Sequence, residues 1–511
     1  MAEYPYRTSF FRIMLHIWDS RRRALIPFTP LKKGVVNFYS CGPTVYNEVH
    51  IGNIRSFLFA DTLRRWLQYG ENYEVQWVMN ITDVDDKTIR DSQKRFPEMP
   101  PMDALLQFTG LYTDLFFETL GKLNIQKSDF YSNPKATDAV SAMQDLVQKI
   151  YNNGFAYIKD GSVYFDVQKY SKLYKYGHLA DVHFDEQQKT GRIEADEYEK
   201  ENAADFVLWK GKKEGEPFWN YELKIKNEEL LQDEQRVKNK KQKEKILSLP
   251  GRPGWHLECS AMEKEAFGLP FDIHSGGVDL CFPHHEDEIA QSTAGYGIDP
   301  NPYWVHNEHL FVEGQKMSKS LGNFFTLSDL QGKGFSPEVI RFFLVTNHYR
   351  TKLNLSFEAL EGAKKTLQRI RNAVRGIATL PIPSQNEETS AAQDFENTFK
   401  KEFSAAMEDD LNVAVAMAKT HEYLSSLSQN SSLLTSSTHK TLHWLESLFG
   451  VSLFPQDQVV PDEVLLWVKQ RDEARVQKNW AESDRLRALI HEQGFEVRDT
   501  PSGGELLPLA V

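Results

Sequence analysis

The hydrophobic pattern near the start of the chain alternates between strand-like and helical segments. The segment VVNFYSCG, residues 35–42, is rich in β-branched and aromatic residues and predicts a strand. From Ile51 to Tyr69 apolar residues recur at helical spacing, and Gly70 then gives a helix stop. A second strand, YEVQWVMNIT, follows at residues 73–82. This order predicts a βαβ unit, in which the start of the helix is a natural position for an anion.

A second pattern of strand, turn and helix begins at residue 271. The apolar strand Phe271–His274 runs into two glycines, and Pro283 then predicts the first turn of a helix. The helix begins HHEDE, which places His284 and Glu288 four residues apart on one face. Two interpretations stay open for this pair: an ordinary exposed pair of side chains, or half of a metal site.

The pattern between and beyond these units is different. Residues 124–250 predict an insertion with a helix up to Gly154, a hairpin around Asp160 and a strongly charged stretch, Tyr221–Leu249. Later segments are amphipathic and helical, and they are separated by a Pro/Ser-rich break; these segments are Leu360–Thr379, Ala391–Ser428 and Pro461–Gln493.

Composition narrows the class of protein. The 511 residues are enough for two to four domains and a sizeable core. Three cysteines are too few for a disulfide framework, so a reducing, cytoplasmic location is expected. We expect no membrane association, because the chain has no long apolar run and no secretion signal at its start. With a net charge of −12, binding to a nucleic acid would require local basic patches.

The three cysteines suggest what the pair at His284 and Glu288 could do. Cys41 ends the first strand and Cys259 lies in GRPGWHLECSAM, whereas Cys281 has an apolar, strand-like context typical of a small buried side chain. Cys41 and Cys259 together with His284 and Glu288 would form a set with two sulfurs, one nitrogen and one oxygen. Two thiolates favour zinc over magnesium or calcium.

Several motifs resemble a known enzyme family. His50-Ile51-Gly52-Asn53 resembles the HIGH signature of class I aminoacyl-tRNA synthetases, and Lys316-Met317-Ser318-Lys319-Ser320 matches their KMSKS signature. The pieces CGPTVY, NITDVDDK, GRPGWHLECSAM, FDIHSGGVDL and FPHHEDEIAQS resemble cysteinyl-tRNA synthetases. Asn53 departs from the signature, which more often ends in His; an amide can donate a hydrogen bond but carries no charge.

The resemblance implies roles for individual residues. It implies phosphate contacts and catalysis by four residues at the two signatures: His50, Asn53, Lys316 and Lys319. It implies one zinc ion that also takes the thiolate of the substrate, and magnesium that accompanies ATP. It places the substrate beside Thr44, Trp255, His274 and Asp279. For Trp255 and His274, packing in the core is an equal alternative.

The fold class implied is α/β, with a Rossmann-type parallel sheet, an inserted α+β region, an all-α helical bundle and a small C-terminal element. The two catalytic halves are expected at residues 1–123 and 251–330, with the insertion between them at 124–250. A linker at 331–359, the helical bundle at 360–455 and the last element at 456–511 are expected to follow.

The implied function is a cysteine–tRNA ligase with ATP, L-cysteine and cysteine tRNA as partners, and a monomer is expected. Two alternatives stay open: a cysteine ligase that uses an amino-sugar acceptor, and a non-catalytic protein descended from a synthetase. The long helical C-terminal part argues against the first, and the intact KMSKS lysines argue against the second. The charged stretch is expected to be a solvated insert, with contact between Arg236–Lys245 and the tRNA backbone as the alternative.

Overall fold

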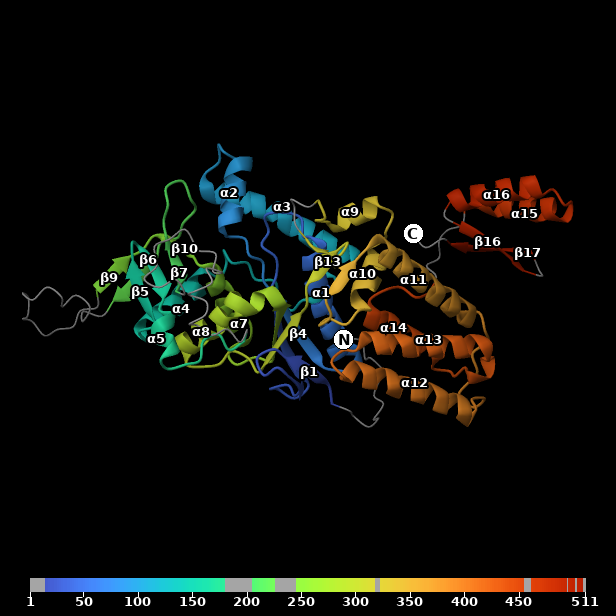
Figure 1. Ribbon diagram of the computed structural model, residues 1–511, viewed down its shortest axis with the longest axis horizontal. Coiled ribbons are helices and arrows are strands. Elements are labelled where there is room, and N and C mark those ends of the chain that lie inside the picture. Colours follow the sequence, from blue (N-terminus) through green and yellow to red (C-terminus); the bar gives the residue numbers. More distant parts are fainter. Residues whose placement is uncertain are drawn as a thin grey trace, which may run out of the picture.

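A computed structural model gives the arrangement of the chain (Figure 1). It describes residues 14–179, 205–225, 245–317, 322–454, 461–493, 495–500 and 503–508. Along its long axis the inserted region lies at one end, the catalytic sheet lies in the middle, and the helical bundle with the C-terminal element lies at the other end.

The centre of the catalytic part is a parallel sheet. Its order is β12-β11-β3-β4, with bounds Tyr303–Asn307, Ile273–Gly277, Val35–Ser40 and Glu74–Met79. β11 pairs with β3 in parallel, which joins segments more than two hundred residues apart at Ile273 and Phe38. All residues of β11 and β12 are buried, as expected for strands covered on both faces. The sheet confirms the predicted α/β class.

Helix α1, Ile51–Arg65, connects β3 to β4 and lies in the core. Its last turn continues as a π-helix, Trp66–Gly70, so the predicted helix and its stop are confirmed. His50 is the N-cap: its Nδ1 accepts hydrogen bonds from the backbone N–H groups of Gly52 and Asn53, at 3.1 and 3.2 Å. The cap fixes the start of the helix at the carboxyl edge of the sheet.

The inserted region has its own antiparallel sheet of order β10-β7-β6-β5. The predicted hairpin is confirmed, because β5 and β6 pair around Asp160 and Gly161, which both have positive φ. β10 also belongs to this sheet, so the sheet extends to residue 253, three residues beyond the boundary expected at 250. The bounds are Ala156–Lys159 for β5, Ser162–Phe165 for β6, Phe206–Gly211 for β7 and Gly251–Pro253 for β10.

The two ends of the charged stretch form a second small sheet, in which β8, Glu222–Ile225, pairs with β9, Lys245–Ser248. Residues 226–244 lie outside the described residues, and so does most of the proposed tRNA contact. The α-helices described between residues 86 and 296 are α2 Asp86–Arg95, α3 Pro101–Lys122, α4 Val140–Asn152, α5 Val167–Ser171, α7 Trp255–Phe267 and α8 Glu286–Tyr296.

The rest of the described chain is mainly helical, as predicted. Hairpin β1–β2 precedes the sheet, and β13, β14 and β15 form a small sheet beside it; the bounds are His16–Asp19, Ala24–Pro27, Leu310–Val312, Gln315–Lys316 and Leu353–Leu355. Then come α9 Leu327–Gly332, α10 Pro337–Val345, α11 Phe357–Ala378, α12 Ser390–Glu408, α13 Val413–Gln429 and α14 Thr438–Phe449. The C-terminal element contains α15 Asp462–Val476, α16 Trp480–Glu492, β16 Phe495–Thr500 and β17 Gly503–Pro508.

A buried charge cluster ties α1 to the helical part. Asp61 is fully buried and accepts hydrogen bonds from Arg64, Arg65 and Arg341. Arg341 and Arg65 also donate to the carbonyls of Phe449 and Ser447, at 2.8 and 2.7 Å. Since those carbonyls belong to the end of α14, the cluster fixes the bundle against the helix that His50 caps.

We expect Asp61→Asn to destabilise the protein by about 3 kcal/mol, because buried arginines would lose their counter-charge. Burial alone would raise the pKa of Asp61, but Arg65, Arg64 and Arg341 hold it well below its usual value. A folded pKa below the unfolded one means that Asp61 stabilises the fold above about pH 4, and that this is lost as pH falls. Urea unfolding at pH 7 and pH 3.5 measures it: the gap between wild type and variant should shrink at the lower pH, and an equal gap would contradict the expectation.

Candidate active site and metal centre

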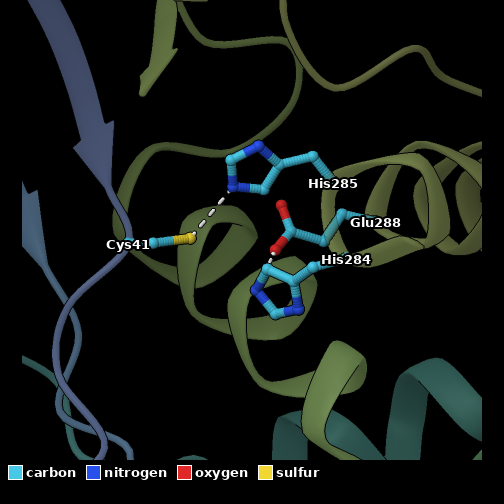
Figure 2. Close-up of side chains that lie close together, drawn as sticks. All are labelled: Cys41, His284, His285 and Glu288. Carbon is cyan, nitrogen blue, oxygen red and sulfur yellow. Dashed lines mark hydrogen bonds and ion pairs between the residues drawn. The ribbon is translucent and has the colours of Figure 1, made fainter. Parts of the chain in front are cut away.

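Four predicted metal ligands lie together at the carboxyl edge of the parallel sheet. Cys41 follows β3, Cys259 lies on α7, His284 lies in a π-helical turn, and Glu288 lies in the first turn of α8. The two sulfur atoms are 3.9 Å apart, and Cys259 Sγ is 3.6 Å from His284 Nε2. His284 Nε2 lies 2.8 Å from Glu288 Oε1. Figure 2 shows Cys41, His284 and Glu288 converging from different parts of the chain.

This arrangement excludes one interpretation of the pair on α8. His284 is 2 % exposed and Glu288 is fully buried, so they are not an ordinary exposed pair. The boundary of the helix also differs from the prediction. Pro283 and Cys281 lie in the π-helical turn Cys281–His285, and α8 begins only at Glu286. Cys281 is buried as predicted, but in a helical turn and not in a strand.

The four residues fit a zinc ion. In a tetrahedral site with bonds of about 2.0–2.3 Å, neighbouring ligand atoms are about 3.3–3.8 Å apart. The sulfur–sulfur and sulfur–nitrogen distances of 3.9 and 3.6 Å are close to that range. Both oxygens of Glu288 are buried and face ring nitrogens: Oε1 lies 2.8 Å from His284 Nε2, and Oε2 lies 3.4 Å from His274 Nδ1. A buried carboxylate is costly unless a positive charge offsets it, and a bound metal ion would supply that charge here.

The thiols support the same conclusion. Burial raises the pKa of Cys41 to about 11. The neighbouring sulfur of Cys41 and burial raise the pKa of Cys259 well above its usual value. Neither thiol ionises easily by itself, whereas a bound divalent cation deprotonates coordinating thiols outright. A cation bound between the two sulfurs would therefore offset the cost of ionising these thiols.

The second predicted feature, the pair of signatures, also comes together. Ile51 N donates to Phe325 O at 2.8 Å, and His50 pairs with Thr326 across an isolated bridge. A Cβ at Gly52 would lie 2.5 Å from Met317 Cε, so Met317 packs directly on the HIGH segment. Lys316 ends β14, and Lys319 lies outside the described residues.

Comparisons with known proteins agree with this geometry. Residues 27–224 and 229–365 match the family model for the class I (C) tRNA synthetase catalytic domain. Cysteine–tRNA ligase of Leptospira interrogans serovar Lai is 40 % identical over 93 % of this chain and 95 % of its own length. The ligase of Methanosarcina mazei is 39 % identical over 96 % and 99 %.

The chain belongs to the cysteine–tRNA ligase family.

Solved structures show the fold of this family in more distant enzymes. Mycobacterium tuberculosis methionyl-tRNA synthetase with methionyl-adenylate has a TM-score of 0.53 at 14 % identity, and the match covers 82 % of this chain and 88 % of that one. An Agrobacterium radiobacter leucyl-tRNA synthetase in a ternary complex has a TM-score of 0.55 at 12 % identity, covering 83 % and 85 %. These likenesses confirm the class I synthetase fold that the sequence predicts.

Two histidines complete the surroundings of the ligand set in this family member. His285 Nε2 lies 3.2 Å from Cys41 Sγ, and Figure 2 shows the carboxylate of Glu288 between the rings of His285 and His284. His285 was not among the residues predicted for the site, although the consecutive histidines in CFPHHE were a signal. His274 Nε2 is 3.5 Å from the same sulfur, and its Nδ1 is 3.2 Å from Glu263 Oε2.

Packing in the core, the alternative for Trp255 and His274, holds for only one of the two residues. His274 is fully buried and stacks on Trp304 at 4.6 Å, so it packs in the core while it contacts Cys41. Trp255 is 39 % exposed and stacks on His284 at 4.2 Å, so core packing does not describe it. Trp255 instead covers the ring of His284 from the solvent side.

The two remaining predicted pocket residues lie near the ends of strands. Thr44 pairs with Thr82 across a parallel bridge, and Thr82 Oγ1 donates to Glu258 Oε2 at 2.7 Å. Asp279 is exposed just after β11, and its carboxylate folds back over Gly277, where a Cβ would lie 2.4 Å from Oδ1. Both positions belong to the edge where ligands bind in open parallel sheets.

Proposed function

We propose that this chain is an ATP-dependent cysteine–tRNA ligase that activates L-cysteine and transfers it to the terminal ribose of cysteine tRNA. The observation that carries the proposal is that Cys41, Cys259, His284 and Glu288 lie together at the same sheet edge as the two signatures. A substrate thiol and the ATP phosphates can therefore reach one site.

Cys41, Cys259, His284 and Glu288 would hold one zinc ion. When bound, zinc supplies a soft Lewis acid that takes the substrate thiolate in preference to a hydroxyl. An apolar pocket alone separates cysteine from serine poorly, so this preference would supply the specificity. Trp255 and His274 line the thiol pocket, Asp279 receives the substrate ammonium group, and Thr44 contacts the substrate.

The two signatures handle the phosphates in this proposal. Because its Nδ1 caps α1, His50 reaches the phosphates through Nε2, and Asn53 donates from the first turn of that helix. Lys316 and Lys319 close over the triphosphate and offset the charge that develops in the transition state. Magnesium accompanies ATP.

The helical part supports tRNA as acceptor. An amino-sugar acceptor would not require α11–α14 and the element after them, and the relatives match over nearly their whole length. We further propose a monomer in the cytoplasm. Within the described residues, no helix is long and apolar enough to cross a membrane.

Cysteine-dependent exchange between ATP and pyrophosphate tests the proposal. The full chain is assayed for bound metal and for exchange in one sample, with serine as the control amino acid. Exchange with cysteine alone, lost when zinc is removed, supports the activation chemistry. Charging of cysteine tRNA then separates the ligase from the amino-sugar alternative, and no exchange at full zinc loading would contradict the proposal.

Asn53 offers a sharper test of phosphate binding. Asn53→Ala should slow exchange about tenfold, the effect expected when one hydrogen bond to a charged group is lost. Asn53→His keeps a donor and should stay within about threefold of wild type. The exchange rate at saturating cysteine measures both, and an unchanged rate in the alanine variant would exclude Asn53 from the phosphate contacts.

A further inference from the structure

A chain of polar side chains leads away from His284, on the side opposite its metal-facing nitrogen. His284 Nδ1 lies 3.0 Å from His256 Nδ1, on α7. His256 Nε2 lies 3.4 Å from Asp287 Oδ2, on α8. The hydroxyl of Tyr176, from the inserted region, donates a hydrogen bond to Asp287 Oδ1 at 2.5 Å. We call Tyr176, Asp287 and His256 the relay.

Asp287 is deeply buried, with 1 % of its surface exposed. Its Oδ2 accepts no hydrogen bond of good geometry from the described residues, so the closest donor that faces it is His256. A buried carboxylate oxygen without a partner costs free energy, and a histidine N–H directed at it reduces that cost. The position of Asp287 therefore favours a proton on His256 Nε2.

The protons of the two rings follow from this contact. If His256 carries its proton on Nε2, its Nδ1 is an acceptor. The Nδ1 of His284 must then be the donor across the 3.0 Å contact. A neutral His284 with its proton on Nδ1 has a lone pair on Nε2, the atom that faces Cys259 Sγ at 3.6 Å and Glu288. This is the tautomer that a metal requires.

We propose that His256 and Asp287 are positioning residues that hold His284 in the tautomer and orientation able to bind the metal, and that Tyr176 anchors Asp287. The inference rests on the zinc site of the proposed function and adds residues that are not among its four proposed ligands. It also gives the inserted region a role, because Tyr176 lies just after α5 and stabilises the site from outside the catalytic sheet.

Zinc affinity of the full chain tests the relay. Asp287→Leu removes both oxygens and should weaken zinc binding about 10- to 100-fold, as measured by competition of the metal-free protein with a chromophoric chelator. Asp287→Asn keeps an oxygen for His256 Nε2 and should recover most of that loss. Tyr176→Phe, which removes a single hydroxyl, should cost about fivefold. In Co²⁺-loaded protein, the absorption bands should shift in Asp287→Leu and not in Asp287→Asn.

The neighbouring acid provides a matched control. Glu286 is 1 % exposed, and its carboxylate accepts a hydrogen bond at 2.7 Å from the backbone N–H of Leu179, in the same loop as Tyr176. Glu286→Gln should therefore disturb the loop and leave zinc affinity within about threefold of wild type.

Three outcomes would overturn the relay, and they differ in what else they reject. Wild-type affinity in both Asp287→Leu and Tyr176→Phe rejects the relay alone. An equal loss in Glu286→Gln and Asp287→Leu reduces the effect to damage of the loop. A wild-type chain that binds no zinc rejects the proposed metal site and the relay with it. Tyr176→Phe decides the matter if Asp287→Leu does not fold, since it changes one oxygen atom.

Discussion

Cys259→Ser should weaken zinc binding about 10²- to 10³-fold and abolish cysteine-dependent exchange at limiting zinc. Zinc binds four-ligand sites with a free energy of about 10–16 kcal/mol, so one ligand contributes about a quarter of that, which corresponds to this fold-change in affinity. A serine hydroxyl is a harder and far less acidic donor than a thiol, so it does not replace the sulfur. Metal content after dialysis and the exchange rate with cysteine are the measurements.

Cys281 supplies the control for this substitution. It is a buried thiol that packs with Leu179, Ile289 and Trp304, and it is not one of the four proposed ligands. Cys281→Ser should keep zinc content and exchange at wild-type levels, at a small cost in stability. Equal zinc content and exchange in Cys259→Ser and wild type would remove Cys259 from the ligand set.

Substitution of His50 has the second large expected effect. Two variants separate the loss of the helix cap from the loss of the phosphate contact. His50→Ala loses both the cap of α1 and the ring nitrogen Nε2, whereas His50→Asn keeps a side chain that caps helices well. Both should slow exchange about 10²- to 10³-fold, the usual cost of losing one donor to transition-state charge. Only His50→Ala should lower the unfolding midpoint.

Thermal unfolding and exchange on the same samples separate the two parts. The cap lies at the N-terminus of the helix that Asp61 joins to the bundle, so its loss should be visible in global stability. If His50→Asn kept the wild-type exchange rate, the cap alone would explain the residue, and the phosphate contact through Nε2 would be wrong.

Much of the site could be predicted because its signals are local. The spacing of His284 and Glu288 follows from one helical turn, and the strand–helix–strand order around His50 follows from periodicity. The softness of two thiols points to zinc whatever the fold. His285 was missed because either histidine of the pair could turn toward Cys41, and only the π-helical turn decides how the two rings lie.

The start of α8 shows the same limit. A proline after a glycine turn is typical of a first helical turn, but here Pro283 lies within the π-helical turn that precedes the helix. The non-helical backbone of Phe282 lies in that turn, and both histidines that follow it are directed into the buried cluster. Local propensity favours a simple helix start, and packing around the cluster overrides it.

The sequence by itself determined the family, the fold class, the order of elements and the types of ligand atom, because motifs and periodicity are properties of neighbouring residues. Only the tertiary structure decided that β11 pairs with β3 and that Cys259, on α7, lies 3.9 Å from Cys41. It also decided that Tyr176, Asp287 and His256 stand behind His284. Contacts between distant segments depend on how buried surfaces pack, and no local pattern encodes them.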